Sequence, residues 1–211
     1  MTPDEFLGRV RALLPALRER APRGEELRHL PPETFADFQE QGLFRVMQPK
    51  RYGGFELDPA TFYEAVTEIG AACGSSGWIF GVVGVHNWHL ALFPPQAQED
   101  VWGADSSTQL STSLAPTGTV ERAPGGFRVS GRWSFSSGCD FCDWAVLGGI
   151  VPPSEDGATP DARTFLVPRG DYAIDDNWHV MGPAAPAART SSSRPPSCRS
   201  TAPTPISTRF T

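Results

Sequence analysis

Three side chains that can take part in chemistry interrupt the longest apolar stretch of the sequence, residues 78–93. They are His86, Asn87 and His89. An imidazole can bind a ligand or exchange a proton near neutral pH. A buried histidine beside an asparagine is also often only a hydrogen-bonded part of the core, and the sequence alone leaves both interpretations open.

Hydroxyl and thiol groups are concentrated further along the chain, in residues 111–113 and 134–142. Serine hydroxyls both donate and accept hydrogen bonds, but serines in a strand near a turn are usually structural. Cys139 and Cys142 have the spacing of a zinc-ligand pair, yet no second pair and no histidine cluster completes a site. We therefore predict no metal site, and the four cysteines show no disulfide framework.

The first 104 residues are predicted to be helical. Apolar residues between Phe6 and Leu17 recur at helical spacing, with arginines on the opposite side. A second helix is expected to open at residues 31–32, which are prolines, and to stop at Gly42. A third is expected to begin at Asp58, a residue type that often caps helices.

The glycine- and serine-rich residues 74–77 are expected to break the third helix. Residues 78–92 then predict a buried helix, and two prolines start a short helix that ends near Gly103. Alternating and apolar runs predict strands at 110–115, 127–133, 144–151 and 164–167, with a hairpin turn at Gly125 and Gly126. Helices followed by strands favour an α+β fold with two layers over a doubly wound sheet.

Charge and composition argue against some classes of protein. With 24 acidic and 18 basic residues the formal net charge is -6, which provides no basic surface for nucleic acid. The apolar residues 78–93 are too few and too often interrupted to span a bilayer, and no signal peptide is recognisable. We expect a cytoplasmic protein with no nucleic-acid or membrane partner.

Five blocks of sequence resemble the oxygenase components of two-component flavin monooxygenases, which share the acyl-CoA dehydrogenase fold. The chain is similar in particular to the types that hydroxylate secosteroid phenols and p-hydroxyphenylacetate. The resemblance runs from the first helix to Gly182, and it is specific because the blocks occur together and in order. The blocks are residues 48–54, 74–78, 85–93, 111–116 and 131–140.

The resemblance implies a helical N-terminal domain at 1–104 and the first part of a central β-domain at 105–182. The C-terminal helical bundle of the family has no counterpart in the sequence. The resemblance further implies that reduced flavin, either FMN or FAD, comes from a separate flavin reductase and lies against the β-domain. There it would react with O2 and hydroxylate a phenol ortho to its hydroxyl group. The resemblance also implies that the full-length protein, with its C-terminal bundle, forms a homotetramer.

Site residues follow from the resemblance, position by position. The residues expected to contact the flavin are Trp78, Thr112, Ser113, Leu114, Phe135, Ser136 and Ser137. His86 is expected to meet the substrate phenol. Thr112 and Phe135 depart from the family, in which serine is usual and tryptophan frequent at these two positions. The catalytic base is unknown, and we expect it in the C-terminal bundle.

Two alternatives stay open. An acyl-CoA dehydrogenase would share the fold and the flavin, but residues 113–118 lack the acidic residue and the Thr-Glu-Pro triplet that those enzymes typically carry. This difference favours the monooxygenase. The alternative from another class is a non-catalytic remnant that only binds or oligomerises.

Residues 183–211 differ in amino-acid composition from the rest of the chain. Pro, Ser, Thr, Ala and Arg make up nearly all of them, and no acidic residue occurs, which predicts a disordered tail. Translated back with GC-rich codons, residues 184–194 give RGTGSTDVVVE in the neighbouring reading frame, and the following residues can give a Val-Pro-x-His-Arg pattern. Both patterns occur in the family. We therefore hypothesise a shift of frame after Gly182 and expect this truncated 211-residue chain to be inactive.

Overall fold

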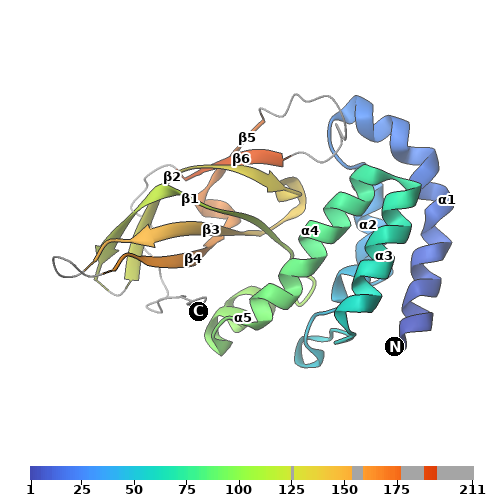
Figure 1. Ribbon diagram of the computed structural model, residues 1–211, viewed down its shortest axis with the longest axis horizontal. Coiled ribbons are helices and arrows are strands. Elements are labelled where there is room, and N and C mark those ends of the chain that lie inside the picture. The colour runs from blue at the N-terminus through green and yellow to red at the C-terminus, as the bar shows by residue number, and fades with distance from the viewer. Residues whose placement is uncertain (125, 154–158, 177–187, 194–211) are drawn as a thin grey trace.

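The computed structural model describes residues 1–124, 126–153 and 159–176, and the backbone of 188–193. These residues form a group of helices on one side and a mixed β-sheet on the other (Figure 1). Helix α4 (Gly74–Ala91) lies at the boundary, between the first three helices and the sheet. The order of elements, helices first and strands afterwards, confirms the α+β fold.

Five helices precede the sheet, and two of them start at a capping side chain. Thr2 and Glu5 form a reciprocal capping box at the start of the first helix. The Asp58 side chain accepts a hydrogen bond from the Thr61 N–H at 3.0 Å, which confirms it as the cap of the third. The helices are α1 (Pro3–Leu27), α2 (Pro32–Glu40), α3 (Pro59–Ala72), α4 (Gly74–Ala91) and α5 (Pro95–Trp102).

The expected break at residues 74–77 is wrong in its position. The chain leaves the helical conformation only at Cys73, and residues 74–77 form the first turn of α4. Gly77 has a packing function instead, because a Cβ atom there would lie 2.5 Å from the Cα of Gly70. The glycines therefore let α3 and α4 approach closely.

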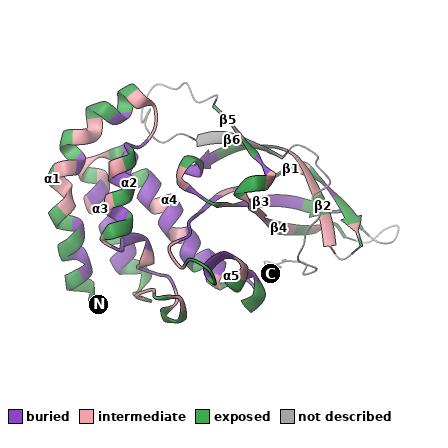
Figure 2. Cartoon of the chain, turned by 180° about the vertical axis from the view of Figure 1, so that it is seen from behind, coloured by how far each residue is buried: buried purple, intermediate pink, exposed green. Residues whose placement is uncertain are grey.

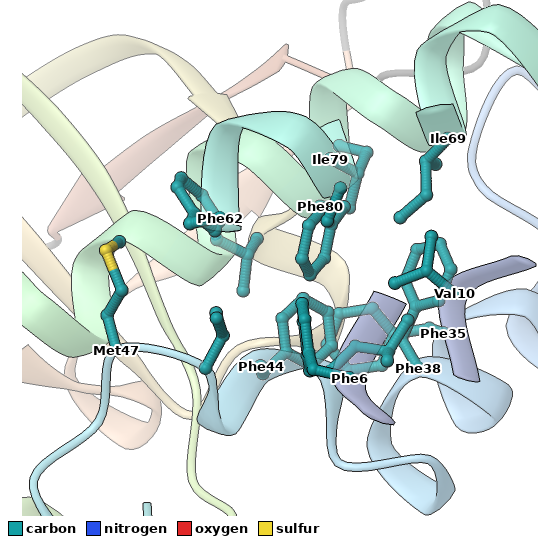
Figure 3. Close-up of a cluster of buried hydrophobic side chains, with 14 of the residues drawn as sticks. Phe6, Val10, Phe35, Phe38, Phe44, Met47, Phe62, Ile69, Ile79 and Phe80 are labelled. Carbon is teal, nitrogen blue, oxygen red and sulfur yellow. The ribbon is translucent and has the colours of Figure 1, made fainter. Parts of the chain in front are cut away.

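Aromatic side chains dominate the core between the helices (Figure 3). The Phe80 ring on α4 lies 5.4 Å from Phe62, 5.7 Å from Phe38 and 6.0 Å from Phe44, measured between ring centroids. All four side chains are at most 1% exposed. Figure 2 shows the same arrangement by burial, with α4 mostly buried and α1 exposed on its outer side. Burial of these rings fixes α4 relative to α2 and α3.

The strands form one six-stranded sheet in the order β4-β3-β1-β2-β6-β5. β1 is antiparallel to β2 and parallel to β3, and the other neighbouring pairs are antiparallel. The predicted strands are confirmed, although β1, β2 and β4 are longer than expected. The strands are β1 (Leu110–Ala123), β2 (Gly126–Ser137), β3 (Trp144–Val151), β4 (Asp161–Pro168), β5 (Ala173–Asp175) and β6 (Ala188–Ser193).

Two irregularities interrupt the central strands at neighbouring places. The β1–β3 register shifts between Ser113 and Gly118, and the β2–β6 register shifts between Trp133 and Ser136. Gly148 on β3 allows the first, because a Cβ atom there would lie 2.0 Å from a backbone oxygen of β1. Such bulges bend a strand and redirect its side chains.

Part of the expected disordered tail is ordered. Residues 188–193 form β6, which pairs with β2 and β5, so the expectation of disorder is wrong for this segment. Pairing satisfies backbone hydrogen-bonding groups along the edge of β2, which composition does not reveal. Residues 177–187 and 194–211, which include the proposed frame shift, lie outside the described residues.

Across the described part of the chain, we find no helix that combines the length and the hydrophobicity needed to cross a bilayer.

Candidate functional site

The residues singled out in the sequence meet where α4 packs against β1 and β2. Trp78 and His86 belong to α4, residues 112–114 to β1, and residues 135–137 to β2. α4 runs beside these strands on the side of the sheet that faces the helices (Figure 1). The structure therefore brings all the predicted site residues to one junction between helices and sheet.

A hydrogen bond joins α4 to β1 at His86. Its Nε2 lies 3.0 Å from the Oγ1 of Thr112. His86 is buried and Thr112 is half-buried. Burial, and to a smaller extent the neighbouring His89, lowers the pKa of His86 to about 3. The imidazole is therefore neutral at neutral pH, and its tautomer decides whether it donates to the hydroxyl or accepts from it.

The other polar residues in the middle of α4 have different surroundings. Asn87 donates to the Phe44 carbonyl at 2.7 Å and to Gln109 Oε1 at 3.1 Å, which ties α4 to the segment before β1. Burial lowers the pKa of His89 as well. Asn87 is thus a hydrogen-bonded part of the core, whereas His86 faces the first strand.

A second hydrogen bond joins α4 to β2. Trp78 Nε1 donates to Ser137 Oγ at 3.0 Å. Ser137 is buried, but Trp78 is 55% exposed and Trp88 on the same helix is 48% exposed, so the expectation that this whole helix is buried is wrong at these two residues. Because α4 is apolar on nearly every side, its sequence pattern does not indicate which side packs against the neighbouring elements.

The hydroxyl groups of Ser113 and Ser136 are used inside the sheet. Ser113 Oγ donates to the Ser134 carbonyl at 2.6 Å, and Ser136 Oγ donates to Ser111 Oγ at 3.1 Å. Both side chains are buried. They stabilise the strands beside the bulges, and the protons of both hydroxyl groups are used within the sheet.

Leu114 and Phe135 project from the two bulges. Leu114 is 52% exposed and Phe135 is 70% exposed. Phe135 has a φ angle of +64°, which is unusual for a residue other than glycine and disfavoured for a bulky one. Strained residues of this kind gather at functional sites, and two large exposed apolar side chains at one place suggest a surface that is covered in the working protein.

An apolar groove of about 370 Å³ runs between α3 and α4, close to this junction. Tyr63 and Trp78, both more than half exposed, are among its lining residues. The groove was not predicted from the sequence. Its signal is the recurrence of glycines on the two helices, at positions 70, 74, 77 and 81.

Cys139 and Cys142 lie buried at the turn that follows β2. Burial raises the pKa of the Cys142 thiol well above its usual value, which opposes formation of the thiolate that metals and electrophiles need. Among the residues that the structure describes, no group of three or more His, Cys, Asp or Glu side chains could hold a metal ion.

The junction therefore combines apolar and polar groups in a defined arrangement. Leu114 and Phe135 offer apolar faces, while Thr112, Ser137 and the neutral His86 offer hydrogen bonds without charge. Such a surface suits a flat, mostly apolar ring system with a few polar atoms at its edge.

Comparison with known families gives a match in the helical part. The family described as acyl-CoA dehydrogenase, N-terminal domain, matches residues 5–106. This segment covers nearly all of α1 to α5.

Among curated proteins, the chain is 53% identical over 174 residues to the oxygenase subunit HsaA of a flavin-dependent monooxygenase from Rhodococcus jostii (strain RHA1). That match covers 82% of this chain and 45% of the relative. The chain is also 39% identical over 185 residues to the oxygenase component of an FADH(2)-dependent resorcinol hydroxylase from Rhizobium sp. (strain MTP-10005), covering 88% and 45%. The chain thus spans about half the length of the curated relatives it matches.

Solved structures of similar proteins also match this chain. The 3-HSA hydroxylase from Rhodococcus sp. RHA1 superimposes with a TM-score of 0.86 at 49% identity, over 90% of this chain and 49% of that one. The HsaA monooxygenase from M. tuberculosis gives a TM-score of 0.88 at 40% identity, over 98% and 52%. XiaF from Streptomyces sp., in complex with FADH2 and glycerol, gives 0.84 at 30% identity, over 91% and 48%.

Proposed function

Because the chain belongs to the flavin-dependent monooxygenases that share the acyl-CoA dehydrogenase fold, we propose that it carries one wall of a phenol-hydroxylating site. The observation that carries the proposal is the pair of hydrogen bonds from α4 to the bulged strands, His86 to Thr112 and Trp78 to Ser137. They bring the polar groups of the helix beside the two exposed apolar side chains of β1 and β2. The relatives that share this segment are named for flavin-dependent hydroxylation.

The residues at the junction fit a flavin. The exposed side chains of Leu114 and Phe135 can cover a flat ring. The β1–β3 register shifts after Ser113 and the β2–β6 register shifts before Ser136, and such bulges leave backbone groups available for hydrogen bonds. Ser137 adds a hydroxyl group that α4 already holds in place. When bound in reduced form, a flavin supplies the electrons that activate O2. Either FMN or FAD satisfies these features, and XiaF is a relative whose structure contains FADH2.

His86 and Thr112 are the proposed contacts for the phenol. A neutral imidazole can share a hydrogen bond with a phenol hydroxyl in either direction, and the low pKa of His86 keeps it in that form at neutral pH. The Thr112 hydroxyl, 3.0 Å from Nε2, can orient the imidazole or itself bind the phenol. The resorcinol and p-hydroxyphenylacetate hydroxylases among the relatives support a phenolic substrate.

The relatives that carry out the complete reaction are about twice as long as the part that this chain matches. The chain spans 45% of the relatives' length, so catalysis of the whole reaction, the flavin reductase as partner and the homotetramer stay proposals. The cytoplasmic location and the inactivity of the 211-residue chain by itself also stay predictions. The catalytic base is not assigned to any residue of this chain.

Two alternatives have observations in their favour. The acyl-CoA dehydrogenase N-terminal domain match would also suit an acyl-CoA dehydrogenase, but residues 113–118 carry no acidic side chain. The apolar groove and the exposed Trp78 favour a non-catalytic binding function. Each alternative predicts a different result when flavin binding and enzymatic activity are measured.

The flavin site is tested by titrating the 211-residue chain with reduced FMN and reduced FAD under anaerobic conditions, with calorimetry as the readout. We expect binding that Ser137→Ala weakens and that Ser130→Ala leaves unchanged, because Ser130 lies on the same strand near its hairpin end. A chain that binds neither flavin contradicts the proposal.

The reaction class is tested in a second assay, with a flavin reductase, NADH, O2 and resorcinol. Hydroxylated product supports the proposed reaction and refutes the predicted inactivity of the chain. Reduction of an artificial dye with an acyl-CoA instead favours the dehydrogenase. Flavin binding without either activity agrees with a site that needs the further length found in the relatives.

A further inference from the structure

We propose that Trp78 is a positioning residue that acts through Ser137, holding the serine hydroxyl so that its proton points to an acceptor atom of the bound ligand. This inference rests on the proposed flavin site and assigns a separate role to one residue within it. It follows from the hydrogen bond between the two side chains and from the packing around it.

The chemistry of the two groups fixes the direction of the hydrogen bond. An indole N–H can only donate, so the Ser137 oxygen must accept at 3.0 Å. The serine hydroxyl has one proton, which stays available for a second partner. When the oxygen of a hydroxyl group already accepts one hydrogen bond, fewer rotations of the O–H group are favourable. Its proton therefore points within a narrower range of directions.

The other serines at this place differ from Ser137 in this respect. The Ser113 hydroxyl donates its proton to the Ser134 carbonyl, and the Ser136 hydroxyl donates to Ser111. Their protons are used within the sheet. Ser137 is the one of the three predicted site serines whose hydroxyl receives a hydrogen bond from α4.

Packing keeps the two partners at a fixed distance. The residue after Ser137 is Gly138, which has a φ angle of +79°. A Cβ atom at this glycine would lie 2.7 Å from Val83 Cγ2 on α4. The end of β2 is therefore pressed against the same helix that carries Trp78, so the serine stays within reach of the indole.

The exposure of Trp78 also fits a positioning role. The side chain is 55% exposed, yet its polar atom is turned into the protein and not towards water. A tryptophan that served only to fill the core would be buried more completely. The exposed ring face can cover part of a ligand while the N–H orients the serine.

The first experiment detects the hydrogen bond without any flavin. In ¹H–¹⁵N spectra of the full 211-residue chain, the indole N–H signal of Trp78 is identified by its loss in Trp78→Phe. We expect Ser137→Ala to move this signal upfield and Ser136→Ala, the matched control, to leave it unchanged. An indole signal that does not respond to Ser137→Ala overturns the inference, whether or not the chain binds flavin.

The second experiment measures whether Trp78 acts through Ser137. Dissociation constants for reduced FMN and FAD are compared for Trp78→Phe, Ser137→Ala and the double variant. Loss of one neutral hydrogen bond predicts a weakening of about three- to ten-fold for each single variant. We expect the double variant to be no weaker than Ser137→Ala alone, because phenylalanine keeps an aromatic ring face and the indole N–H has no further effect once its partner is absent.

Trp88→Phe is the matched control for this comparison, since Trp88 lies on the same helix and is 48% exposed. We expect it to bind flavin as the unmodified chain does. Additive losses in Trp78→Phe and Ser137→Ala overturn the role given to Trp78 while leaving the flavin site in place. Absence of flavin binding in the unmodified chain contradicts the proposed function and the ligand role of this pair together.

Discussion

Acid should destabilise this protein through His86 more than through an ordinary histidine. The folded protein keeps this imidazole neutral, because burial lowers its pKa from 6.5 to about 3. The unfolded chain binds a proton there once the pH falls below about 6.5. Between the two values the unfolded state holds more protons, so the folded state loses stability as the pH falls. The folded state therefore has its full stability with respect to His86 at pH values above about 6.5, the pKa of this imidazole in the unfolded chain.

The size of the effect follows from the gap between the two pKa values. A gap of about 3.5 pKa units corresponds to at most about 5 kcal/mol, reached only near pH 3. Between pH 7 and pH 5 the same linkage predicts a loss of about 2 kcal/mol in the free energy of unfolding. His89, whose pKa burial also lowers, adds to the slope in the same direction.

His86→Gln tests this reasoning, because glutamine keeps an amide that can hydrogen-bond Thr112 and has no proton to gain. The measurement is urea unfolding at pH 7 and pH 5. We expect the loss of stability between these pH values to be smaller in the variant by about 2 kcal/mol. His29→Gln is the control for removing an imidazole elsewhere. The reasoning is refuted if the unmodified chain and His86→Gln lose the same stability, or if the ¹⁵N shifts of His86 show protonation at pH 5.

Four further predictions concern the core, the bulges and the gene. Phe80→Ala should lower the free energy of unfolding by about 3–5 kcal/mol, because the ring is fully buried among three others; a urea midpoint close to that of the unmodified chain would contradict this. Phe135→Gly should raise stability by up to about 1 kcal/mol, since glycine accepts the +64° φ angle, while flavin titration should show weaker binding; a destabilised variant would show that no strain is stored there. Gly148→Ala should destabilise by about 1–3 kcal/mol through the 2.0 Å approach to the backbone of β1, whereas Gly126→Ala, which has no neighbour within 4 Å, should not, and equal melting temperatures would refute this account of the bulge. Sequencing the coding DNA across codons 181–194 should show one inserted or missing base relative to its relatives, and an uninterrupted frame would disprove the frame shift.

Several elements of the fold could be predicted from local sequence. Helical spacing of apolar residues, proline and aspartate at helix starts, and alternation in the strands identified α1, α2, α3 and the first four strands. These signals are local because each depends on residues a few positions apart. The same reasoning failed at residues 74–77, where glycines were expected to break a helix but instead allow α3 to approach α4.

The site was predicted less completely. Resemblance to a family supplied the residue types and positions, from Trp78 to Ser137, but not how they are used. It did not reveal that Ser113 and Ser136 hydrogen-bond within the sheet, or that Trp78 is exposed. It also missed the groove, because its walls come from two helices whose facing sides only packing determines.

The class of fold, most of its elements and the family could be predicted from the sequence, since these depend on local pattern and on blocks of residues in order. The hydrogen bonds of His86 with Thr112 and of Trp78 with Ser137 join residues 26 and 59 positions apart, and they could be found only in the folded chain. The tertiary structure also sets which side of α4, a helix that is apolar on nearly every side, is buried. The physical reason is that burial and hydrogen bonding between distant segments depend on how α4 packs against bulged strands, and no local pattern encodes that contact.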